Sequence, residues 1–218
     1  MDRVAFLARL SRSLAHAQLP PDAAQARDAE VATTSGRGEI LRLFLDRAHE
    51  SGAVPCVVPT IQAAQEAVEK LVARRAWTRV VCRSSMVWPG IGSIHSSDAR
   101  SADLGLATAD WAVAETGSVA VESSPEADRG SSLLPAATGF FVSLESILET
   151  TGDALRKQLA REPRAIPSCT CLVTGPSSTG DLAAQHVVGA HGPVEVFIWV
   201  IEGSADAAPA AETSRADD

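Results

Sequence analysis

Short apolar runs alternate with amphipathic helical segments over most of this chain, and this alternation constrains its fold more than any other feature. Residues 53–58 and 79–82 are strand-like, and residues 61–74 between them carry apolar side chains at helical spacing after the candidate N-cap Thr60. A strand, a helix and a strand with short connections form a βαβ unit, in which the two strands are parallel. We therefore expect an α/β fold.

The middle and the end of the chain continue this pattern and add one hairpin. Two runs of small and β-branched residues, 111–114 and 118–121, are separated by three residues that include a glycine, which predicts an antiparallel pair. These elements together predict a three-layer α/β/α fold with a mostly parallel sheet and some antiparallel elements. We expect further strands over 139–143, 169–173 and 194–201 and further helices over 39–51, 144–161 and 178–188.

The two ends of the chain differ from this central part. Residues 2–18 have the apolar spacing of an amphipathic helix, and small polar residues follow up to residue 38. The last residues, 204–218, are rich in Ala and Asp, which is typical of disorder. We expect an N-terminal helix and linker over 1–38, one α/β domain over 39–203 and a disordered acidic tail. The N-terminal helix is also a candidate arm for a homo-oligomer.

Composition and charge argue against nucleic acid and membrane as partners. Aromatic residues make up 4% of the chain, whereas single-stranded nucleic acid is bound by aromatic stacking. The net charge of −8 repels a phosphate backbone. The longest clearly apolar run, 196–201, is too short to span a bilayer, and Arg9 and Arg12 interrupt the apolar segment that a signal peptide needs. We expect a cytoplasmic protein.

The four cysteines are Cys56, Cys82, Cys169 and Cys171, and none of them forms a C-x-x-C pair. The ligand spacing of zinc ribbons and of ferredoxin-type clusters is therefore missing. A chain of this size with so few cysteines is also a poor candidate for an extracellular disulfide framework. We expect reduced thiols, mostly in the core, and no resident metal or redox cofactor.

The segment 174–181, with the sequence TGPSSTGD, is the first candidate for a site. It follows an expected strand and opens an expected helix, where free backbone N–H groups and the helix dipole favour an anion. Gly175 lets the backbone approach a ligand closely, and Ser177 and Thr179 add hydroxyl donors. The alternative interpretation is an ordinary capped turn, because Ser and Thr are frequent N-caps.

Two further turns carry titratable side chains. Glu115 lies with Thr116 and Gly117 at the tip of the expected hairpin, where a carboxylate can orient a ligand, bind a cation or take a proton. An equally good interpretation of Glu115 is a solvated turn residue. His191 and Gly192 form a turn just before the last strand, and a lone histidine in a turn is most often polar surface.

Taken together, these segments resemble the two signatures of the LUD-domain family. Residues 102–118 read ADLGLATADWAVAETGS, residues 174–181 read TGPSSTGD and residues 189–193 read GAHGP, in the order and at the spacing of that family. The resemblance covers roughly residues 40–203 and corresponds to the short form of the family, which lacks ferredoxin-type cysteines.

The resemblance implies a fold from the superfamily of ribose-5-phosphate isomerase, glucosamine-6-phosphate deaminase and the CoA transferases, which agrees with the three-layer prediction. It also implies a role in oxidising L-lactate to pyruvate together with iron–sulfur partner proteins. We expect an accessory subunit that binds a small anionic metabolite and holds no redox cofactor itself. The candidate catalytic residue is Glu115, and the candidate ligand-binding residues are Asp103, Thr116, Gly117, Gly175, Pro176, Ser177, Thr179, Asp181, His191 and Gly192.

This chain departs from the family pattern at two positions of the second signature. Ser178 stands where the family usually has Arg, and Ala183 stands where it usually has Glu. The missing arginine is a planar two-pronged donor suited to a carboxylate, and Arg100 and Arg129 are candidate substitutes. Two alternatives stay open: a stand-alone ligase- or transferase-type enzyme similar to 5-formyltetrahydrofolate cyclo-ligase, and a member that has kept the fold and lost the site.

Overall fold

The chain divides into two compact units, Met1–Thr34 and Ser35–Asp218. In the first unit Val4 and Ala8 are helical, and the rest of the expected helix over 2–18 lies outside the described residues, as does the expected tail over 204–218. The computed structural model describes Val4, Ala8 and residues 36–83, 96–123, 129–162, 166–182, 185–188 and 192–203.

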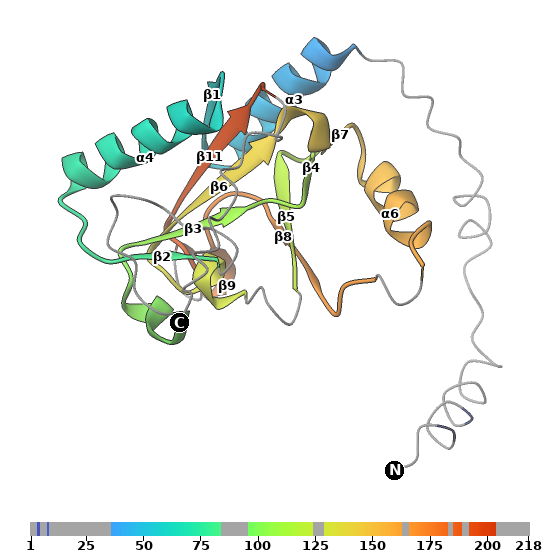
Figure 1. Cartoon of the computed structure of the whole chain (residues 1–218). Helices are drawn as coiled ribbons and strands as arrows, with labels where there is room; N and C mark the ends of the chain where they lie inside the picture. The colour runs from blue at the N-terminus through green and yellow to red at the C-terminus, as the bar shows by residue number, and fades with distance from the viewer. Residues whose placement is uncertain are drawn as a thin grey trace, which may run out of the picture. The chain divides into compact units, whose positions relative to one another are not determined.

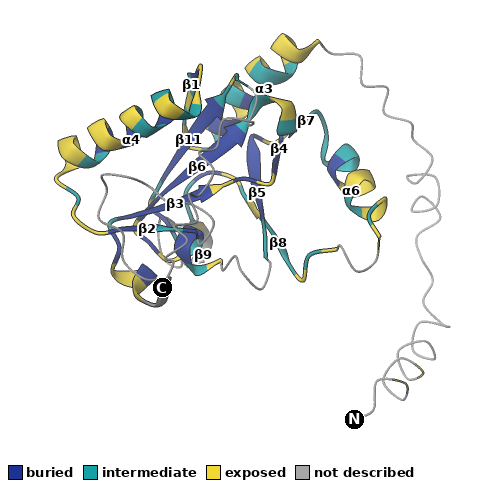
Figure 2. Ribbon diagram, in the orientation of Figure 1, coloured by how far each residue is buried: buried dark blue, intermediate teal, exposed yellow. Residues whose placement is uncertain are grey.

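Five parallel strands form one sheet of the second unit, in the order β1-β11-β6-β3-β2 (Figure 1). The inner strands β11 (Glu195–Ile201), β6 (Ala137–Ser143) and β3 (Leu104–Thr108) are almost wholly buried, as Figure 2 shows. Near-continuous apolar runs are typical of parallel strands that are covered on both faces. The strands of the predicted βαβ unit, β1 (Val54–Val58) and β2 (Val80–Cys82), are parallel and occupy opposite edges of the sheet.

Each face of this sheet is covered by a separate layer. On one face lies α4 (Ile61–Arg75), which buries Val68 and its neighbours against the sheet. On the other face lies α3 (Arg37–Glu50), through Phe44 and its neighbours, together with a second sheet. The predicted α/β class with a mostly parallel sheet is confirmed, and the second sheet shares one of the covering layers with α3.

The second sheet has four strands in the order β7-β4-β5-β8. Its centre is the predicted hairpin, in which β4 (Trp111–Val113) and β5 (Ser118–Glu122) are antiparallel. At one edge β7 (Ile147–Leu148) pairs with β4, and at the other edge β8 (Thr170–Val173) runs antiparallel to β5. The predicted hairpin is therefore confirmed, and it carries the first signature into the core.

The segment expected as one helix over 144–161 is divided into three elements. A short 3₁₀ helix, η2 (Leu144–Ser146), leads into β7, and α6 (Thr151–Leu159) follows. Thr150 caps α6, because its hydroxyl accepts a hydrogen bond from the backbone N–H of Asp153 at 3.1 Å. Ala154 of α6 packs with residues of β4 and β5, so α6 covers the outer face of the small sheet.

The expected helix over 178–188 is wrong. Residues of this segment form two antiparallel strands, β9 (Ser178–Leu182) and β10 (Gln185–Val188), in a sheet of their own. Gly180 is a poor helix former, and the β-branched pair Val187 and Val188 favours a strand. Sequence alone was ambiguous here because Ser and Thr open both helices and turns.

Short helical segments lie between β2 and β3 and between β5 and β6. They are the 3₁₀ helix η1 (Ser96–Ser101) and the four-residue helix α5 (Gly130–Leu133). Buried Ser131 of α5 places its carbonyl beside Gly105 of β3, where a Cβ would come within 2.0 Å of that oxygen. Within the described parts of the chain, every helix is too short or too polar to cross a bilayer.

Candidate functional site

The turn between β8 and β9 lines an open groove of about 440 Å³. The other walls are the end of α5 and the turn before β11. This volume lies in the range of small-molecule sites. The structure thus brings together four predicted ligand-binding residues, Gly175, Pro176, Ser177 and Gly192. The lining residues are Leu133, Leu172, Val173, Thr174, Gly175, Pro176, Ser177, Ser178, Gly192 and Pro193.

The chemistry of the groove differs from the predicted one. Because β9 replaces the expected helix, the helix dipole that was to hold an anion is missing from this turn, and that part of the prediction is wrong. The described lining has apolar, hydroxyl and backbone groups, with no ionised side chain among them. Such a groove recognises a ligand by hydrogen bonds from hydroxyl and backbone groups and not by a fixed opposite charge.

The two turns that form the wall are joined through their backbones. The N–H of Ser177 donates to the carbonyl oxygen of Pro193 at 2.8 Å. Gly192 lies against Ser177, because a Cβ on Gly192 would come within 3.0 Å of the Ser177 Cβ. The GPSS turn and the GP turn of the second signature therefore fix each other, although about fifteen residues separate them in the sequence.

A chain of hydroxyl groups links the first signature to the second. The Oγ1 of Thr116 lies 2.7 Å from the Oγ of Ser118, which lies 2.6 Å from the Oγ1 of Thr174. Ser118 is buried between two exposed partners, and Thr174 lines the groove. A hydroxyl donates one hydrogen bond and accepts others, so Ser118 bridges Thr116 to Thr174 in the groove wall. Ser118 and Thr174 were not among the predicted ligand-binding residues.

The end of α3 supports both signature turns. Gly117 has φ +64°, and a Cβ there would come within 2.2 Å of the backbone nitrogen of Ala48. Gly175 has φ +69°, and a Cβ there would come within 2.0 Å of the carbonyl oxygen of Ser51. Both glycines combine a left-handed backbone with a close backbone approach, which an L side chain does not allow. One helix end therefore sets the positions of the two turns.

Glu115 is exposed and holds the start of α6. Its Oε2 accepts hydrogen bonds from the backbone N–H of Thr151 at 2.9 Å and from the hydroxyl of Thr151 at 3.2 Å. A carboxylate at a helix N-terminus stabilises that helix. Glu115 is not among the described residues that line the groove, and its catalytic role stays a prediction.

The other predicted residues lie apart from the groove, or their side chains lie outside the described residues. Asp103 accepts hydrogen bonds from the backbone N–H groups of Thr78 and Arg79 at 2.9 and 3.0 Å, so it closes the turn that leads into β2. Thr179 and Asp181 belong to β9, but their side chains lie outside the described residues, as does all of His191. The ligand-binding roles of these residues stay predictions.

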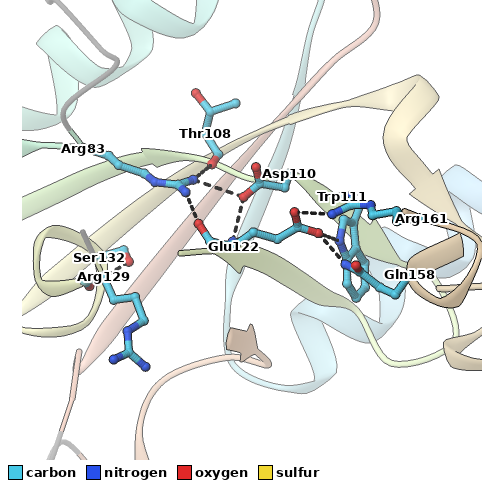
Figure 3. A network of polar contacts seen from close by, with 9 residues as sticks. All are labelled: Arg83, Thr108, Asp110, Trp111, Glu122, Arg129, Ser132, Gln158 and Arg161. Atoms are coloured by element: carbon cyan, nitrogen blue, oxygen red, sulfur yellow. Dashed lines mark hydrogen bonds and ion pairs between the residues drawn. The ribbon is translucent and has the colours of Figure 1, made fainter. Parts of the chain in front are cut away.

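The candidate arginine substitutes also lie outside the described groove wall. Arg100 is exposed in η1. The guanidinium of Arg129 donates to the Sγ of Cys169 at 3.1 Å, and Figure 3 shows it pointing away from Asp110. Neither side chain contributes to the lining that the structure describes.

A buried arginine that sequence reasoning missed joins the two sheets. Arg83 is 6% exposed and follows β2. Its guanidinium donates to the carbonyl oxygen of Thr108 at 3.2 Å, to the carboxylate of Asp110 at 3.1 Å and to the carbonyl oxygen of Glu122 (Figure 3). Its partners lie 25 to 39 positions away in the sequence, so local patterns gave no signal.

The carboxylate of Glu122 is the second centre of this network. It accepts hydrogen bonds from the indole N–H of Trp111 at 2.7 Å, from Arg161 at 2.7 Å and from Gln158 (Figure 3). Burial raises the pKa of Glu122, but the hydrogen bonds from Arg161, Trp111 and Gln158 and the charge of Arg161 together hold this pKa below its ordinary value. The network ties the end of α6 to the small sheet.

The four cysteines are free thiols, and their burial differs from the prediction. Cys56 is exposed on β1, and the other three are half-buried, so the expectation that most are core residues is wrong. Burial raises the pKa of Cys82 to about 11. Around the described residues, no group of three or more His, Cys, Asp and Glu side chains is placed to hold a metal ion.

Comparison with known proteins gives consistent matches. Residues 95–201 match the family model described as the LUD domain. The chain is 35% identical to the uncharacterized protein YkgG of Escherichia coli over 122 residues, which are 55% of this chain and 53% of that protein. It is 35% identical to lactate utilization protein C of Bacillus licheniformis over 113 residues, which are 51% of this chain and 47% of that protein. The chain spans about half the length of these curated relatives.

A solved structure supports the same fold. The crystal structure of a DUF162 family protein from Deinococcus radiodurans superposes with a TM-score of 0.57 and 20% sequence identity. The match covers 77% of this chain and 99% of that one. The predicted resemblance is thereby confirmed: residues 95–201 match the LUD domain model, and about half of the chain is similar to lactate utilization protein C.

Proposed function

We propose that this chain is a ligand-binding subunit of an L-lactate utilisation system, and that the groove beside Thr174 binds a small carboxylate such as L-lactate or pyruvate. The observation that carries the proposal is that the second signature lines the groove and that hydrogen bonds through Ser118 link Thr116 of the first signature to Thr174 in the groove wall. The names of several relatives, lactate utilization protein C, supply the metabolic context.

The lining suits a small hydroxy acid. Ser177 and Ser178 offer hydroxyl donors and Gly175 offers close backbone approach, while Leu133 and Leu172 offer an apolar wall for a methyl group. Hydrogen bonds from hydroxyl and backbone groups to a carboxylate are charge-assisted and compensate in part for the arginine that Ser178 replaces. The expected affinity is accordingly modest.

In this proposal the chain supplies binding groups, and the electrons of lactate pass to partner proteins. Iron–sulfur proteins are the class of partner that the family resemblance implies. Cytoplasmic location and homo-oligomer formation through the N-terminal helix belong to the same proposal.

Thermal unfolding of the purified chain against a ligand panel tests the binding claim. The panel contains L-lactate, pyruvate, phosphate, ATP with magnesium and 5-formyltetrahydrofolate. A ligand at about 100 times its dissociation constant stabilises the folded state by about 2.7 kcal/mol, which is a shift of roughly 5–10 °C for a domain of this size. We expect this shift with L-lactate or pyruvate.

A pair of matched variants locates the binding. Ser177→Ala combined with Ser178→Ala removes two hydroxyls from the groove and is expected to reduce the ligand-induced shift. Ser146→Ala removes a hydroxyl of η2, which donates to the Ser143 carbonyl oxygen, and is expected to leave the shift unchanged. A shift only with ATP or the folate contradicts the proposal and favours the ligase-type alternative, in which Glu115→Gln abolishes turnover.

A further inference from the structure

Cys169 and Cys171 form a pair of thiols on one face of a sheet edge. They are separated by one residue, and side chains two apart on a strand point to the same face. That face is the one from which Val173 packs against the main core, whereas Leu172, between Cys171 and Val173, is exposed on the other. Both thiols are half-buried, so a small oxidant can reach them.

A cationic group contacts this pair. The guanidinium of Arg129 donates to the Sγ of Cys169 at 3.1 Å from the start of α5. A guanidinium beside a sulfur stabilises the negative charge that this sulfur carries when it reacts as a nucleophile, and it disfavours a bound cation. Two sulfur ligands next to a positive charge are a poor metal site, and a good site for oxidation.

We propose that Cys169 and Cys171 form a peroxide-sensitive dithiol that closes to an intrachain disulfide. The thiolate of Cys169 attacks one oxygen of hydrogen peroxide, so that an S–O bond forms, the O–O bond breaks and hydroxide leaves, taking a proton to become water. The thiol of Cys171 then attacks the sulfenic sulfur, so that an S–S bond forms, the S–O bond breaks and a second water leaves. The two thiols lose two electrons in total, and the peroxide gains them.

The order of attack follows from the two environments. Cys169 carries the hydrogen bond from Arg129, whereas at Cys171 burial and the charge of Cys169 raise the pKa, and the charge of Arg129 offsets this only in part. Cys171 is therefore the resolving thiol, which reacts after the sulfenic acid has formed.

The backbone geometry allows the bond with a small local change. Residues two apart on a strand have Cα atoms about 6.6 Å apart, near the upper end of the disulfide range of about 4.4–6.8 Å. β8 is an edge strand, and Cys169 lies just before its first residue, so a bend there disturbs a single neighbour, β5. Because Leu172, Val173 and Thr174 line the groove, the bond closes beside the groove wall.

Peptide mapping of the full chain after treatment with hydrogen peroxide tests the proposal. Free thiols are alkylated after the reaction, and the peptide that holds both cysteines is analysed by mass spectrometry. We expect this peptide to lose the mass of two hydrogen atoms and both alkylation sites, and dithiothreitol should restore both. Cys56→Ser is expected to leave this product unchanged, because Cys56 is a solitary exposed thiol on β1.

Single variants distinguish the proposed steps. Cys171→Ser should leave a sulfenic acid at Cys169 that dimedone traps. Arg129→Gln should slow the loss of thiols several-fold, whereas Arg100→Gln, at an exposed arginine of η1, should not change the rate. The proposal is overturned if Cys56 is oxidised while Cys169 and Cys171 both remain thiols, or if Cys169 forms its disulfide with another chain.

Discussion

The molecule concentrates its polar groups in two regions of opposite character. The network around Arg83 and Glu122 is charged and largely buried, and its carboxylates accept hydrogen bonds from several donors (Figure 3). The groove beside Thr174 is uncharged in its described lining and open to solvent. The charged groups hold one sheet to the other, whereas the groove offers hydroxyl and backbone groups that a ligand can use. In our proposal, the strongest polar interactions therefore hold the fold together and the ligand binds elsewhere.

Removal of Arg83 is expected to have the largest effect on the network. Arg83→Met leaves the Asp110 carboxylate and two backbone carbonyl groups without their charged donor. Asp110 is exposed and keeps the hydrogen bond from the Glu122 N–H, so the loss lies below that of a fully buried ion pair, at roughly 3 kcal/mol of unfolding free energy. Urea unfolding measures this loss, and Arg79→Met, at an exposed arginine at the other end of β2, should change stability by less than about 0.5 kcal/mol.

A side chain at position 175 is expected to push the groove wall away from the end of α3, which supports it. Gly175→Ala forces a left-handed backbone on alanine and brings its Cβ against the carbonyl oxygen of Ser51. The two effects together cost about 2–4 kcal/mol. The matched control is Gly38→Ala, which meets open space in the first turn of α3 and should stabilise the chain slightly. Equal stability of the two variants in urea would show that the backbone at Ser51 moves aside at little cost and does not fix the turn.

Loss of the Glu122 charge is expected to have a smaller effect that depends on pH. Glu122→Gln removes the ion pair with Arg161 and costs about 1–3 kcal/mol at neutral pH. Because the folded-state pKa of Glu122 lies below its ordinary value of 4.5, its charge contributes stability above that value. This contribution is lost as pH falls through the folded-state pKa.

Unfolding curves from pH 7 downward measure this dependence. The wild-type chain and Glu122→Gln should converge in stability at acidic pH, because the protonated carboxyl resembles the amide. A constant difference at all pH values would contradict a role for the Glu122 charge. The same variant should keep the ligand-induced shift of the groove, which separates the two regions.

The hydroxyl chain is expected to affect stability least and binding most. Ser118→Ala removes two hydrogen bonds, but Thr116 and Thr174 are exposed and can bond to water, so the cost is about 1 kcal/mol. Because Thr174 loses its anchor at the groove, affinity for the carboxylate should fall several-fold. Calorimetric titration with L-lactate measures this affinity. An unchanged affinity would show that the first signature does not contribute to ligand binding.

The sequence predicts elements whose signals are local. The βαβ unit around α4 and the β4–β5 hairpin follow from periodicity and from one glycine-containing turn, and both are present. The segment of β9 and β10 is wrongly predicted as a helix, because Ser178 and Thr179 resemble an N-cap. The two strands pair with each other within this segment instead.

The residues of the candidate site also fall into those that local sequence signals predict and those that they do not. Gly175, Ser177 and Gly192 could be chosen from their turn chemistry, and all three line the groove. Arg83 and Ser118 could not be chosen, because their importance lies in contacts between residues far apart in sequence. The polar side chain of Ser118 on the otherwise apolar strand β5 is the one local sequence feature that points to the hydroxyl chain.

A chemical-shift titration of the isotope-labelled chain with L-lactate distinguishes the two regions in one experiment. Our account predicts that the amide signals of Thr174, Gly175, Ser177, Ser178 and Gly192 move in a saturable way, while those around Arg83 and Glu122 stay in place. Saturable movement confined to the Arg83 network, or none at these groove residues, would contradict the assignment of the groove as the ligand site.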